Sequence, residues 1–91
     1  MRWEELKWEV AQVLNCFAFR EFPEAAKRIG RLIVRMRRLK RKGVLDGWRA
    51  DWVLRELHDA ARWLRRGQDE LALMHVQAAN RLMWQYLRGE L

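Results

Sequence analysis

The stretch PEAAKRIGRLIVRMRRLKRKG, residues 23–43, decides the fold prediction. Pro23 suits the first turn of a helix, and Gly43 is a natural left-handed residue at the end of one. Between them, apolar residues recur at spacings of three and four, which is the period of an amphipathic α-helix. The predicted apolar arc of this helix consists of Ala25, Ala26, Ile29, Leu32, Ile33, Met36 and Leu39.

The same helix carries an unbroken block of positive charge. Nine of the 19 Lys and Arg residues lie from Lys27 to Lys42, and none of the 12 Asp and Glu residues lies there. Because the rest of the chain is slightly acidic, this segment accounts for the whole net charge of +7. At 100° per residue, most of these cations fall on an arc opposite the apolar one. The predicted binding residues on that arc are Lys27, Arg28, Arg31, Arg35, Arg38, Arg41 and Lys42.

Three further helices are expected, and no segment shows the alternation of a strand. The first should end near Phe19, the third should run from an N-cap at Asp46 to about Arg66, and the fourth should open at Asp69. A chain of 91 residues is long enough for one modest core, so residues 1–91 are predicted to form a single domain. The predicted fold is all-α: a four-helix, mostly antiparallel bundle that self-associates.

Composition excludes several classes of protein. The chain has no Ser or Thr, which rules out a Ser or Thr nucleophile and a phosphate-binding loop ending in Lys-Ser or Lys-Thr. Its one cysteine, Cys16, cannot form an internal disulfide and is compatible with a reducing compartment. No signal peptide and no apolar run of about 20 residues is present. We expect a cytoplasmic protein that does not enter membranes.

The two histidines are interpreted as structural. His58 lies on a polar face of the third helix with Arg55, so a surface position is expected. His75 lies on an apolar arc near Leu71 and Leu82, where a buried, hydrogen-bonded ring is expected. Because these histidines and Cys16 match no metal-ligand spacing and no nucleophile–base pattern, we expect no metal, no cofactor and no catalysis.

Several aromatic residues lie away from the main apolar stripe of their helices. Exposed aromatic clusters usually mark an interface, although such rings can also cap the ends of a small bundle. Stacking on single-stranded bases is a third use, favoured if the rings border the basic arc. The predicted interface residues, for a homo-oligomer or a protein partner, are Trp8, Phe19, Trp48, Trp52, Trp63 and Trp84.

Residues 60–79, AARWLRRGQDELALMHVQAA, resemble a helical hairpin of HEPN domains and, more loosely, a tetratricopeptide unit. The region of likeness extends over residues 60–87. HEPN ribonucleases carry an Arg followed by a His after four to six intervening residues. No Arg occupies the corresponding positions before His58 or His75. The resemblance therefore implies a non-catalytic helical bundle that dimerises.

The basic arc predicts binding to a nucleic-acid backbone, DNA or RNA. A row of Arg on a rigid face can neutralise successive phosphates and release counterions, and its planar fork suits phosphate oxygens. No Asn or Gln lies on the arc to read adenine, so little base specificity is expected. An accessory subunit or a mobile-element regulator would fit these properties.

The basic arc can also be compared with other kinds of cationic helix. A recognition helix of the helix-turn-helix type would carry its contacts at the start of a helix after the turn, which this segment does not. A membrane-surface helix would carry Trp or Phe on its apolar arc, and this arc has neither. An acidic protein surface fits the same electrostatics. The alternative function is therefore a protein-interaction module, of the inhibitor or antitoxin type, docking on an acidic or nucleic-acid-binding partner surface.

Overall fold

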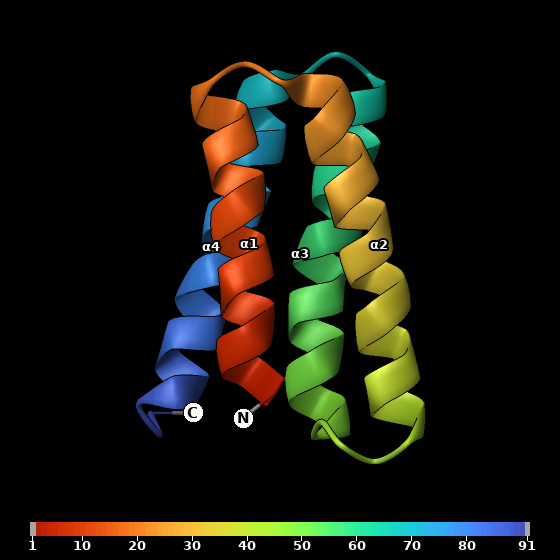
Figure 1. Ribbon diagram of the computed structural model, residues 1–91, viewed down its shortest axis with the longest axis vertical. Helices are drawn as coiled ribbons and strands as arrows, with labels where there is room; N and C mark the ends of the chain where they lie inside the picture. Colours follow the sequence, from red (N-terminus) through yellow and green to blue (C-terminus); the bar gives the residue numbers. More distant parts are fainter. Residues whose placement is uncertain (1, 91) are drawn as a thin grey trace.

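The computed structural model describes residues 2–90, which fold into four α-helices joined by short turns (Figure 1). The helices are α1 (Arg2–Ala18), α2 (Phe22–Arg41), α3 (Gly47–Arg65) and α4 (Asp69–Leu87). No strand occurs within those residues. The predicted all-α, four-helix fold is confirmed.

The helices form a closed ring. Figure 1 shows consecutive helices running in opposite directions, with both ends of the chain at the same end of the bundle. α1 packs against α2 and α4, and α3 also packs against α2 and α4. As a result α2 and α4 lie diagonally opposite each other, and each has one long face directed away from the bundle.

The turns follow the predicted boundaries closely. Gly43 and Gly67 adopt φ angles of 74° and 73°, so both supply the left-handed conformation that ends a helix. α1 ends at Ala18, and Arg20 takes the left-handed conformation in the turn that follows. Asp46 occupies the N-cap position of α3, as predicted, but its side chain does not cap the helix. Its carboxylate forms no cap hydrogen bond and instead accepts one from Arg49 Nη1 at 2.5 Å.

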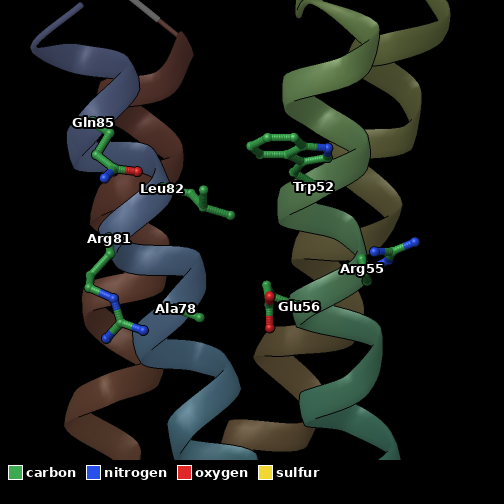
Figure 2. A pocket seen from close by; sticks show the side chains of 7 residues that line it. All are labelled: Trp52, Arg55, Glu56, Ala78, Arg81, Leu82 and Gln85. Atoms are coloured by element: carbon green, nitrogen blue, oxygen red, sulfur yellow. The ribbon is translucent and has the colours of Figure 1, made fainter. Parts of the chain in front are cut away.

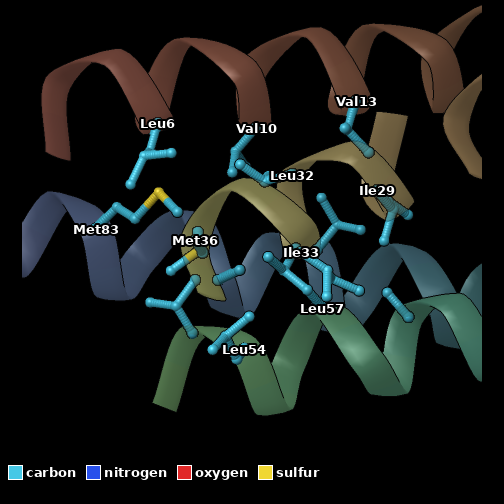
Figure 3. Packing of buried hydrophobic residues seen from close by; sticks show 14 of the residues in the cluster. Leu6, Val10, Val13, Ile29, Leu32, Ile33, Met36, Leu54, Leu57 and Met83 are labelled. Atoms are coloured by element: carbon cyan, nitrogen blue, oxygen red, sulfur yellow. The ribbon is translucent and has the colours of Figure 1, made fainter. Parts of the chain in front are cut away.

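The core is a single apolar cluster between the four helices (Figure 3). Trp3 is buried in it, and its ring lies 5.0 Å from that of Tyr86. The prediction that Ala26 belongs to the buried arc of α2 is wrong, because Ala26 lies at the edge of that arc and is exposed. The largest fully buried side chains are Leu6, Val10, Val13, Ile29, Leu32, Met36, Val53, Leu57, Val76 and Met83.

The length and hydropathy of the four helices decide whether any of them could span a membrane. Within the described residues, none of the four is both long enough and apolar enough to cross a bilayer.

The core position of Val53 can be tested against an exposed valine. Val53 is fully buried in α3, whereas Val34 in α2 is 54% exposed. Val53→Ala removes buried methyl groups and leaves a cavity, so we expect a loss of roughly 2 kcal/mol in the free energy of unfolding. Val34→Ala should change that free energy by less than about 0.5 kcal/mol. Urea unfolding followed by circular dichroism measures both, and equal losses would contradict the described core.

Candidate nucleic-acid interface

The core determines which way the cations of α2 point. Ile29, Leu32 and Met36 are buried, so the opposite side of the helix faces away from the bundle. The five residues of the basic arc that are exposed are Lys27, Arg31, Arg38, Arg41 and Lys42. None of these five forms an ion pair with any other residue in the range 2–90. They form what we call the α2 ridge.

A shallow groove of about 610 Å³ runs along the α2 ridge. Small residues, Ala26 and Gly30, line it together with the exposed Val34. A Cβ atom built on Gly30 would meet no other atom within 4 Å. The surface between the cations is therefore low and unobstructed, and the backbone of a ligand can approach the helix closely there.

Two members of the predicted set are paired with carboxylates. Arg35 forms ion pairs of 2.8 Å with both Glu5 and Glu9 of α1, and Arg28 lies 3.0 Å from Glu24 within α2. No acid lies within residues 27–42, but these two residues of the basic arc are offset by carboxylates from outside that segment. The sequence could not reveal the α1 carboxylates because they lie some thirty residues from Arg35 in the chain.

A second cationic groove, of about 470 Å³, lies between α2 and α3. Arg37, Arg41 and Arg55 line it and have no carboxylate partner among the described residues. Lys40 also lines it, and its ammonium group is 2.5 Å from Asp51. Neither Arg37 nor Arg55 was among the binding residues predicted from the sequence. The only signal for Arg55 was its place on the polar face of α3.

His58 lies at the α2–α3 groove as a neutral ring. The guanidinium of Arg37 donates a hydrogen bond to its Nε2 at 2.9 Å, which requires that nitrogen to be unprotonated. Burial lowers the pKa of His58 from its ordinary value, and the charges of Arg37 and Arg65 lower it further. Asp59 opposes them by raising this pKa. The expected surface position of His58 is confirmed.

The predicted interface aromatics lie on three helices, α1, α3 and α4, and in the turn after α1. Trp48 and Trp52 contact each other on α3, whereas the Lys7 ammonium lies 4.3 Å above the ring of Trp84 at the α1–α4 side. Trp63 is partly buried against the core. The remaining two residues, Trp8 and Phe19, are strongly exposed, on α1 and in the turn after it.

His75 belongs to a cluster that the sequence analysis missed. Its Nδ1 atom lies 2.7 Å from a carboxylate oxygen of Glu56 and 4.0 Å from one of Asp59, so the ring is hydrogen-bonded but only partly buried. Three ligand atoms this close could hold a metal ion. However, His75 and Arg62 already satisfy the two carboxylates: Arg62 lies 2.5 Å from Asp59.

Comparisons with protein-family models, with curated proteins and with solved structures find no match to this chain. The resemblance of residues 60–87 to a HEPN hairpin stays a prediction. What the fold and its surface define is a small four-helix bundle with one strongly cationic side, made by α2 and the adjoining part of α3.

The lowered pKa of His58 makes stability depend on pH. The unfolded chain binds a proton at His58 near pH 6.5, whereas the folded chain does so only at lower pH. The contribution of neutral His58 to the free energy of unfolding is therefore complete above about pH 6.5 and is lost as the pH falls below that value. We expect His58→Gln to lose less stability than the wild type between pH 7 and acidic conditions, as measured by urea unfolding. A parallel loss in both proteins would contradict this role.

Proposed function

We propose that the protein binds the phosphate backbone of nucleic acids through the α2 ridge. The observation that carries this proposal is that Lys27, Arg31 and Arg38 point away from the core with no carboxylate partner among residues 2–90. An ordinary solvated face mixes both signs of charge, which lowers its attraction for a polyanion. The five residues of the α2 ridge instead carry one sign along a rigid helix, and carboxylates meet the basic arc only at Arg28 and Arg35 among the described residues.

The length of the ridge suits several phosphates. With a rise of about 1.5 Å per residue, Lys27 and Lys42 are separated by roughly 22 Å along the axis. Phosphates of one strand of a duplex advance by about 3.4 Å per base pair, so the ridge extends over roughly six of them. Each neutralised phosphate releases condensed counterions, which makes affinity fall steeply with salt.

The ridge favours backbone contact over base readout. Its long side chains are all Lys or Arg, and the small residues beside them offer no hydrogen-bonding groups to distinguish bases. We therefore infer binding with little sequence preference, of the kind useful to an accessory subunit or a mobile-element regulator.

A protein partner is the second candidate function. Trp48 and Trp52 are each about half exposed and are in edge-to-face contact, and exposed aromatic residues of this kind are enriched at protein interfaces. An inhibitor or antitoxin could use them together with the ridge against an acidic surface. Self-association and a cytoplasmic location also stay predictions.

Neutralising the ridge should reduce both affinity and its salt dependence. If the five unpaired cations each contact a phosphate, the slope of log K against log salt is about −4.5 for duplex DNA and about −3.5 for single strands. Arg31→Gln with Arg38→Gln removes two contacts and should make the duplex slope shallower by about 1.8. Fluorescence anisotropy of a labelled duplex at several salt concentrations measures this change.

The matched control is Lys7→Gln with Arg88→Gln. It removes the same net charge from the α1–α4 side, where the Lys7 ammonium lies over the Trp84 ring, and from the turn after α4. Affinity and slope should stay close to those of the wild type. If the two double variants lose affinity equally, binding follows net charge alone and the α2 ridge is not the interface. If binding by the wild type does not depend on salt, the result favours a protein partner.

Arg35 should matter less than Arg38. Both side chains lie on α2, but the guanidinium of Arg35 already contacts Glu5 and Glu9. Because Arg35 is already paired in the unbound protein, it contributes less than Arg38 to counterion release on binding. Arg35→Gln should therefore change the salt slope by less than half as much as Arg38→Gln. Anisotropy titrations of the two single variants test this order, and equal effects would show that the α1 carboxylates release Arg35 on binding.

A further inference from the structure

A third groove, of about 270 Å³, lies between α3 and α4 and is not part of the α2 ridge. Figure 2 shows Trp52 and Leu82 pointing toward each other across the gap between these helices, with Ala78 beside Leu82. Polar groups stand around this apolar floor. They are Arg55, Glu56, Arg81 and Gln85. The groove is slightly below the usual size range of drug-sized pockets, so it suits a small group.

An aromatic platform forms one wall of this groove. Trp52 is 48% exposed although it is a large apolar side chain, and Trp48 packs against it edge-to-face with the ring centroids 5.6 Å apart. Trp48 in turn contacts Tyr86 of α4. These contacts hold the Trp52 ring while half of its surface stays open. A fixed, half-open indole beside apolar side chains is the arrangement on which proteins stack unpaired bases.

The aromatic groove and the α2–α3 groove share one lining residue. Arg55 lines both this groove and the α2–α3 groove that contains Arg37 and Arg41. Arg81 adds a second cation to the rim, and the one acid there, Glu56, is already held by His75 at 2.7 Å. A strand whose phosphates follow Arg41 and Arg55 therefore brings its bases toward Trp52.

We propose that the groove between α3 and α4 is a nucleobase-binding subsite and that the ligand of the protein is a single-stranded nucleic acid. A base inside a duplex is stacked and paired, so it can reach the Trp52 ring only after being extruded at a cost of several kcal/mol. Single strands present unstacked bases at no such cost. This inference rests on the proposed function, because it extends the backbone path from the α2 ridge to a site for the bases.

The test compares Trp52→Ala with Trp8→Ala on two single-stranded probes. The probes have the same length, about a dozen nucleotides, and one of them lacks its bases at every position. Stacking of one base is worth about 5- to 150-fold in affinity, so Trp52→Ala should weaken binding of the complete probe by about tenfold or more. It should leave binding of the abasic probe unchanged. Trp8→Ala removes a 65% exposed indole from α1 and should affect neither probe.

Circular dichroism and Trp52→Phe guard against a loss of fold. Trp52→Phe keeps an aromatic platform and should retain most of the affinity. The subsite is overturned if Trp52→Ala weakens binding of both probes equally, or if it leaves both affinities unchanged. If affinity is unchanged and the mass measured by light scattering falls, Trp52 is assigned to a contact between copies. Failure of the proposed function is distinct: in that case Arg31→Gln with Arg38→Gln leaves binding of both probes unchanged.

Discussion

The burial of the apolar arc of α2 is the constraint on which the surface of this protein depends. Once Ile29, Leu32 and Met36 enter the core, the helix can no longer rotate about its axis. Lys27 and Arg31 must then face away from the bundle. The direction in which the cations point is thus a consequence of core packing. A cationic face on this helix requires a matching apolar arc on the opposite side of the helix.

Such a face has an energetic cost, and the structure offsets part of it. Like charges four residues apart on a helix destabilise it by a few tenths of a kcal/mol per pair. Arg35 is relieved by two carboxylates of α1, and Arg28 by Glu24 one turn earlier. The cations in the last turn, Arg38 among them, also interact favourably with the helix dipole. The repulsion that is left lies along the exposed ridge, where only counterions or a polyanion can reduce it.

Features that depend on one helix, such as the direction of its side chains, could be predicted from the sequence. Features that depend on contacts between two helices could not. The positions of Lys27 and Arg38 follow from 100° per residue and a well-defined apolar arc. The pairing of Arg35 could not be predicted, because it requires knowing that α1 lies beside α2 in the correct register. The grooves that α3 forms with α2 and α4 depend in the same way on helix order. Ala26 was misassigned because alanine carries too little hydrophobicity to define the edge of an arc.

The ring order of the helices gives α3 a special position. It is the helix that contacts both α2, with its cations, and α4, which forms the other wall of the aromatic groove. Arg55 borders both grooves because it lies on α3, the helix that the two grooves share. In a bundle where α2 and α4 were not both packed against α3, the cationic and aromatic groups would lie on unconnected faces. The cationic and aromatic grooves meet in this small protein because one helix forms a wall of both.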